Sequence, residues 1–132
     1  MPSQPNTNYS INTSDKVVAI ANVKLLGPTA SATMGAFTVP DGVMGDIDFV
    51  IGGLTTETVT VAISQDGTNW SAALKPVQGA TGKDHPTTTM TTGYYTLPVL
   101  RFGSPKFVKF TKSAAVEVAS VAVAVPTVSR MW

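Results

Sequence analysis

The sequence has 132 residues, no cysteine and one histidine; charged residues make up 13% of it, and the formal net charge is +1. A chain of this length buries enough apolar surface to fold as one domain without a disulfide or a metal. The lack of cysteine excludes disulfide frameworks, thiolate catalysis and the usual structural zinc sites, and the nearly balanced charge argues against non-specific nucleic-acid binding, which relies on several Lys or Arg neutralising phosphates.

The first 14 residues contain two prolines, three asparagines and a single aromatic residue, Tyr9, without periodicity. We expect an extended arm. The segment shows no secretory signal, and the longest apolar run, residues 114–125, is too short for the roughly 20 residues that cross a bilayer. The sequence therefore predicts a soluble chain with no membrane partner.

Three strands are predicted between residues 16 and 52. In residues 16–26 apolar side chains occur at both odd and even positions, so we expect both faces of this strand to be covered, and Gly27-Pro28 to end it. Residues 33–39 form a shorter strand with Phe37 and Val39 directed inward, closed by a turn at residues 40–42. Residues 45–52 alternate regularly between apolar and polar positions, as a half-buried strand requires.

The stretch 58–74, TVTVAISQDGTNWSAAL, predicts a hairpin. Alternation over residues 58–63 indicates a strand, and Asp66-Gly67 supplies the positive φ that tight turns need. Trp70 shares one face of the returning strand with Ala72 and Leu74, so we expect it to cap the core. The alternative is a binding rim formed by the turn and Trp70.

Residues 76–93 are rich in Gly, Thr and Pro and are predicted to be a long loop, of which residues 87–92 could extend into a strand. Further strands are expected at 94–97, 99–102 and 106–111. In residues 116–125 the valines change parity, which a β-bulge near Ala119-Ser120 would reconcile. Pro126 is expected to end this last strand, leaving a tail at residues 129–132.

About eight short strands separated by turns, with no amphipathic helix, indicate an all-β protein: an antiparallel β-sandwich or jelly roll with an extended N-terminal arm. The predicted organisation is an arm over residues 1–14, a single β-sandwich domain over residues 15–128 and a C-terminal tail over residues 129–132.

Catalytic chemistry has few candidates. His85 lies in a polar loop with no rigid element to orient it, and a general base must first be positioned. Asp46 and Asp48 share a strand face, but calcium prefers six to eight oxygen ligands from a loop. No phosphate loop, dinucleotide fingerprint or zinc spacing is present. We therefore expect no catalytic, cofactor or metal site, and no enzymatic activity.

Candidate contacts with a protein partner come from cations and aromatic residues. Lys106, Lys109 and Lys112 lie close together in the sequence, but Lys109 has the opposite strand parity, so the spacing does not predict a single basic stripe. We expect these lysines to form a docking contact or a solvated face instead of a nucleic-acid site. Trp132, beside Arg130 and Met131, either plugs its own domain or anchors a partner, since Trp and Arg are frequent at interface hot spots. The candidate contacts are Tyr9, Lys106, Lys109, Lys112, Arg130, Met131 and Trp132.

The pattern V-x-V-x-x-S-x-D-G-x-x-W, from Val59 to Trp70, resembles a hairpin found both in discoidin-like carbohydrate-binding β-sandwiches and in small β-sandwich virion proteins of tailed bacteriophages. The whole chain is more similar to the capsid decoration or cement proteins of such phages. It shares their small size, strands rich in Thr, Ala, Val and Gly, sparse charge, polar N-terminal arm and aromatic C-terminus.

The resemblance to decoration proteins implies a structural protein made in the host cytoplasm and located on the virion. It would bind the outer surface of an icosahedral capsid as a small homo-oligomer and bridge major capsid protein subunits. The other resemblance implies a glycan-binding module of a phage tail or fibre, with Asp66, Trp70 and Tyr94 as its candidate residues. A third possibility is another tail or neck component.

Overall fold

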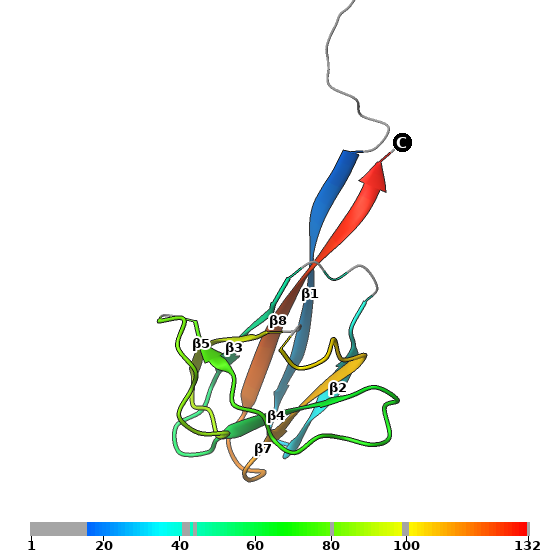
Figure 1. Ribbon diagram of the computed structural model, residues 1–132. Coiled ribbons are helices and arrows are strands. Elements are labelled where there is room, and N and C mark those ends of the chain that lie inside the picture. The colour runs from blue at the N-terminus through cyan, green and yellow to red at the C-terminus, as the bar shows by residue number, and fades with distance from the viewer. Residues whose placement is uncertain (1–15, 41–42, 44, 80, 99–100, 132) are drawn as a thin grey trace, which may run out of the picture.

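The computed structural model describes residues 16–40, 43, 45–79, 81–98 and 101–131, and contains eight β-strands and no helix within these ranges. The strands are β1 (Lys16–Thr29), β2 (Thr33–Thr38), β3 (Ile47–Gly52), β4 (Val59–Ser64), β5 (Val77–Gln78), β6 (Gly93–Leu97), β7 (Phe107–Lys112) and β8 (Ala119–Met131). They form a five-stranded sheet in the order β1-β8-β3-β6-β5 and a three-stranded sheet in the order β2-β7-β4, both antiparallel (Figure 1). The predicted all-β fold is confirmed, and its form is a β-sandwich.

Alternate residues of each central strand form the core between the sheets. In β3 the buried positions are Ile47, Phe49 and Ile51, and the residues between them face outward or are half-buried. The Phe49 ring stacks on Tyr95 of the same sheet, with 5.7 Å between ring centroids, and meets the edge of Phe110 from the other sheet at 5.0 Å. This aromatic contact therefore joins the two layers of the sandwich.

Both long strands extend further than the sequence predicted. β1 continues past Gly27-Pro28 to Thr29, with an irregularity in register between Leu26 and Thr29. β8 continues past Pro126 to Met131, so residues 129–131 are paired strand and the predicted tail is wrong over these residues. Pro126 is tolerated because pairing between β3 and β8 ends at Ala124. Beyond this residue one edge of β8 has no neighbouring strand in the described part of the chain, so the missing N–H of proline removes no hydrogen bond on that side.

The predicted bulge near Ala119-Ser120 has a counterpart on the neighbouring strand: the pairing of β1 with β8 is irregular between Leu26 and Thr29, where two β1 residues lie opposite Ser120. The predicted change of facing within β8 does not occur, since β8 begins at Ala119 and its register with β3 is unbroken. Val116 and Val118 belong instead to the loop between β7 and β8, where 77% and 60% of their surfaces are exposed. The change of parity in the sequence therefore marks the end of a loop.

The segments around the β4 hairpin form less regular structure than predicted. Residues 70–74 form no strand, although the amides of Ser71 and Leu74 each donate to a β4 carbonyl at 2.9 Å. The 76–93 region contains the short strand β5, while residues 87–92 contribute a single bridge, Met90 to Val59. Residues 101 and 102 lie in a turn; residues 41–42 and 99–100, on which two further predictions fall, are outside the described residues.

The outer parts of β1 and β8 project from the sandwich as a two-stranded ribbon (Figure 1). From Asn22↔Val125 to Lys16↔Met131 the two strands pair with each other, beyond the last β8 residue that pairs with β3. We call residues 16–22 with residues 125–131 the β1–β8 ribbon. Because a two-stranded ribbon is only marginally stable in water on its own, these outer pairs contribute little to the stability of the sandwich.

Candidate interaction surfaces

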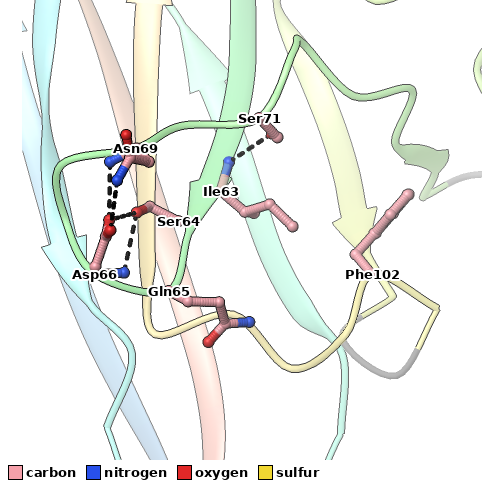
Figure 2. Close-up of a pocket in the computed structure, with 7 residues that line it drawn as sticks. All are labelled: Ile63, Ser64, Gln65, Asp66, Asn69, Ser71 and Phe102. Atoms are coloured by element: carbon pink, nitrogen blue, oxygen red, sulfur yellow. Dashed lines mark hydrogen bonds between the residues drawn. The ribbon is translucent and has the colours of Figure 1, made fainter.

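The predicted turn at Asp66-Gly67 is present, and hydrogen bonds from its own side chains hold it together. Gly67 has a φ of +80°, which glycine adopts without strain. Asp66 Oδ1 accepts from the backbone N–H group of Asn69 at 2.8 Å, and Asp66 Oδ2 accepts from Asn69 Nδ2 at 2.7 Å (Figure 2). Asp66 Oδ1 also accepts from the backbone N–H group of Thr68 at 2.8 Å. These bonds, led by that of the Asn69 amide, hold the pKa of Asp66 far below its usual range. Both oxygens of the Asp66 carboxylate are therefore already hydrogen-bonded within the turn.

Trp70 does not cap the core, contrary to the sequence prediction. It is half-buried and lies outside the cluster of buried side chains. The Lys109 ammonium lies 4.5 Å from the centre of its ring, a cation–π contact. Since Val108 and Phe110 point inward, Lys109 faces the outside of the three-stranded sheet. Trp70 therefore covers the outer side of that sheet.

The substitution Trp70→Ala is expected to lower the free energy of unfolding by about 1 to 2 kcal/mol, since an exposed cation–π contact contributes under about 1 kcal/mol and the ring is only partly buried. Urea denaturation measures this effect. A loss of about 3 to 5 kcal/mol, which is typical of a Trp removed from a core, would contradict the position of Trp70 outside the core.

The three glycan-binding candidates are not brought together. Tyr94 lies on β6 and is 47% exposed on the outer side of the five-stranded sheet, whereas Trp70 covers the outer side of the three-stranded sheet. Two packed sheets are about 10 Å apart, so the full thickness of the sandwich separates the two rings. Asp66 stands beside a depression of about 350 Å³ near Phe102, but the turn already uses its oxygens (Figure 2).

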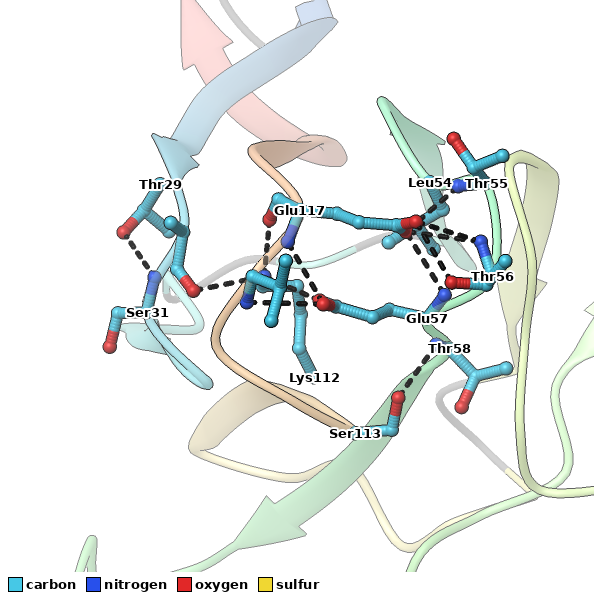
Figure 3. Close-up of polar contacts among 12 residues, drawn as sticks. Thr29, Ser31, Leu54, Thr55, Thr56, Glu57, Thr58, Lys112, Ser113 and Glu117 are labelled. Carbon is cyan, nitrogen blue, oxygen red and sulfur yellow. Dashed lines mark hydrogen bonds and ion pairs between the residues drawn. The ribbon is translucent and has the colours of Figure 1, made fainter.

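Lys112, predicted as a partner contact, is buried in the molecule. It lies on the same face of β7 as Val108 and Phe110, and its side chain has no exposed surface. Its Nζ donates to Glu57 Oε1 at 2.8 Å, to the Ala30 carbonyl at 3.0 Å and to the Glu117 carbonyl (Figure 3). The prediction is wrong because strand parity places Lys112 on the inward face.

A pair of glutamates, which the sequence analysis missed, completes this network. Glu57 Oε2 accepts from the amides of Glu117 and Val116 at 2.9 and 3.1 Å, and the Glu117 carboxylate accepts from the amides of residues 55–57 at 2.8 to 3.2 Å (Figure 3). The bond from Lys112 lowers the pKa of Glu57, and the bonds led by that of the Thr55 amide lower the pKa of Glu117 to about 2. The network holds the β7–β8 loop against residues 55–57.

Stability is expected to fall in acid because both glutamates have folded-state pKa values below the usual value of 4.5. A carboxylate of this kind stabilises the fold above its unfolded pKa, and this contribution is lost as pH falls from about 4.5 towards about 2. Thermal unfolding between pH 7 and pH 2 should show the decline. In Glu117→Gln we expect lower stability at pH 7 and a shallower decline below pH 5; equal slopes in both proteins would contradict the role of Glu117.

The remaining predicted contacts do not form one basic surface. Lys106 is exposed next to β7, Lys109 packs on Trp70 and Lys112 is buried. Arg130 and Met131 are in β8 at the far end of the β1–β8 ribbon, paired with Val17 and Lys16. Tyr9 and Trp132 are outside the described residues.

His85 is held more firmly than the sequence predicted. Its amide donates to the Pro76 carbonyl at 2.7 Å, Nδ1 lies 2.8 Å from the Thr87 carbonyl oxygen, and the ring meets Tyr95 edge-on at 5.5 Å between centroids. Asp48 accepts a bond from Thr96 Oγ1 at 2.8 Å. Across the described part of the chain, no group of three or more His, Cys, Asp or Glu side chains is placed to hold a metal ion.

The outer side of the five-stranded sheet carries an apolar row, which we call the outer apolar face. The register pairs Leu25 with Ala122, Ala122 with Val50, and Val50 with Tyr94, across four neighbouring strands. Leu25, Val50 and Tyr94 are 58%, 49% and 47% exposed, and Val23, in the next row, is 72% exposed. Within a single chain, the expected coverage of both faces of residues 16–26 therefore does not extend to Val23 and Leu25.

No family model matches the chain, and no curated protein matches it. The crystal structure of the SPBc2 prophage-derived protein YomS is similar, with a TM-score of 0.66 and 15% sequence identity, over 91% of this chain and 100% of that chain. At this identity the likeness shows a shared fold. None of the described segments forms a helix that is long and apolar enough to span a membrane.

Proposed function

We propose that this protein is a structural virion protein of a bacteriophage, of the capsid decoration type. It binds the outer surface of an icosahedral capsid and bridges neighbouring major capsid protein subunits. Its fold is shared with a prophage-derived protein. A role of this kind requires a rigid body with binding surfaces and needs neither a catalytic centre nor a cofactor, and the small number of charged residues disfavours nucleic acid as the partner.

The observation that carries the proposal is the β1–β8 ribbon. It extends both strands beyond the sandwich, from Asn22↔Val125 to Lys16↔Met131 (Figure 1). A ribbon packed into the groove between two capsid subunits gains the stabilising contacts that it lacks in isolation. The register pairs Lys16 with Met131 and Val17 with Arg130 at its far end, so each strand contributes one basic residue to this end, which suits an acidic capsid surface.

Modest contacts are sufficient for such a protein. A standard interface buries about 1,200 to 2,000 Å² in total, and a small oligomer that engages several equivalent sites gains avidity from effective concentration. The sandwich is already ordered and loses little further entropy on binding.

A truncation tests the proposal. A chain that lacks residues 1–19 and 128–132 loses most of the ribbon but keeps the pairs from Ile20↔Thr127 inward. We expect it to unfold at nearly the same temperature as the full chain, and to occupy far fewer sites on capsids that have been stripped of the protein and then incubated with it. A chain that lacks only residues 1–15 is the matched control. Full occupancy by the shorter chain, folded as before, would reject the role of the ribbon.

A further inference from the structure

We propose that the outer apolar face is the docking surface for a second copy of this chain, with the two five-stranded sheets packed face to face about a two-fold axis. The surface is distinct from the β1–β8 ribbon that the capsid proposal uses. The inference does not rest on that proposal, because it concerns the isolated protein in solution.

The relief of the face fits a copy of itself. Val23 and Leu25 form a ridge along β1, and Val50 and Tyr94 form a second ridge on β3 and β6. Between the ridges β8 presents only small side chains, Ala122 and Ala124, so that a depression of about 310 Å³ lies over them. A two-fold axis that runs parallel to the strands, between β1 and β8, places the β1 ridge of each copy in the valley of the other, the interdigitation by which sheets pack face to face.

The face is rigid before it binds. Its members are paired residues of neighbouring strands, and the backbone of Gly79 donates to the Tyr94 carbonyl at 3.0 Å. The Tyr94 ring lies so close over Gly79 that a Cβ at that position would collide with it. Little conformational entropy is therefore lost when the two faces meet.

Charge favours a second copy as the occupant. The lining of the depression contains one charged residue, Asp48, which is half-buried and accepts a hydrogen bond from Thr96. The chain as a whole has a net charge of +1, so two copies approach with little repulsion. A partner with a charged surface would leave its own charges without counterparts on this face.

The area is sufficient for the centre of a dimer interface. The four ridge side chains together expose roughly 400 Å² of apolar surface, within the range of patches that are often functional on monomeric proteins. Two copies would bury on the order of 800 Å² from these residues, about half of a standard interface, and the surrounding residues supply the remainder. We therefore expect a reversible dimer of moderate affinity.

Sedimentation velocity of the full chain, from about 1 μM to about 1 mM, tests the proposal. We expect a concentration-dependent dimer in the wild type. Ala122→Arg should weaken association by about 100-fold or more, since the long side chain fills the valley that the β1 ridge of the other copy occupies. Val116→Arg is the matched control: it adds the same charge at an exposed valine of the β7–β8 loop, and should dimerise like the wild type.

Leu25→Glu, at a residue that is 58% exposed, repeats the test should Ala122→Arg fail to fold. The proposal is overturned if the wild type stays monomeric over the whole range, or if folded variants of the face associate as the wild type does. It is equally overturned if deletion of residues 1–15 abolishes a dimer that the face variants retain, because the N-terminal segment then carries the contact. Capsid occupancy is measured separately, so failure here leaves the ribbon experiment unaffected.

Discussion

Lys112→Met is expected to lower the free energy of unfolding by about 3 to 5 kcal/mol, the usual result of removing one partner from a buried ion pair. The Lys112 side chain has no exposed surface and donates to Glu57 and to the carbonyls of Ala30 and Glu117. Methionine fills a similar volume but leaves the Glu57 carboxylate and both carbonyls without this donor. Urea denaturation at pH 7 gives the value.

Lys109→Met is the control for this substitution, because Lys109 lies on the same strand and faces outward against Trp70. It should cost about 1 kcal/mol or less. A loss for Lys112→Met as small as that of the control would contradict the buried network.

Phe49→Ala is expected to cost about 3 to 5 kcal/mol, the range for aromatic residues removed from cores. Phe49 is 1% exposed and contacts Tyr95 in its own sheet and Phe110 in the other. Removal of its ring would leave a cavity at the centre of the core and remove its contacts with both sheets. Denaturation by urea or guanidinium, with the slope compared with that of the wild type, measures the loss.

Val50→Ala, measured at protein concentrations that keep the chain monomeric, is the matched control, since Val50 is the next residue of β3 and 49% exposed on the opposite face. We expect a loss of about 1 kcal/mol or less, because little buried surface is removed. Comparable losses at the two positions would show that β3 is buried on both faces, which contradicts the sandwich with an open outer face.

The strands were predictable wherever alternation of apolar residues is regular. β3 and β4 match the predicted segments closely, because in both strands one face is buried in the core and the other is not. The strand ends were less predictable, because proline and glycine usually end a strand. Pro126 lies within β8 where β3 no longer pairs with it. Gly27-Pro28 lies within β1 at an irregularity in its pairing with β8. Whether a strand has one neighbour or two is a tertiary fact that a local pattern does not contain.

The turn explains the Ser, Asp and Gly positions of the V-x-V-x-x-S-x-D-G-x-x-W pattern. Ser64 Oγ donates to Asp66 Oδ1 at 3.0 Å and accepts from the Gly67 amide at 2.8 Å. The Ser, Asp and Gly of the pattern thus supply hydrogen-bond partners for one another, and a turn built in this way can occur in proteins with different functions. This is why the pattern predicted the turn correctly but not the surroundings of Trp70.

The polar network could have been foreseen only in part. Lys112 shares its parity with Val108 and Phe110, which indicates an inward position, and Glu117 interrupts an apolar run without an obvious reason. However, their partners lie about 60 residues away in the sequence, on the loop before β4. The outer apolar face was hidden for a similar reason: Leu25, Ala122, Val50 and Tyr94 become neighbours only through the strand order of the five-stranded sheet.

The number of copies per purified phage particle tests the proposed function most directly. Quantitative mass spectrometry of particles, calibrated against the major capsid protein, supplies this number. A decoration protein that occupies symmetry-related sites over the shell predicts hundreds of copies, on the order of the number of capsid subunits, with contacts made by many modest interfaces of standard size. Six to a few dozen copies would place the protein in the tail or neck, and its absence from particles would contradict a structural role in the virion.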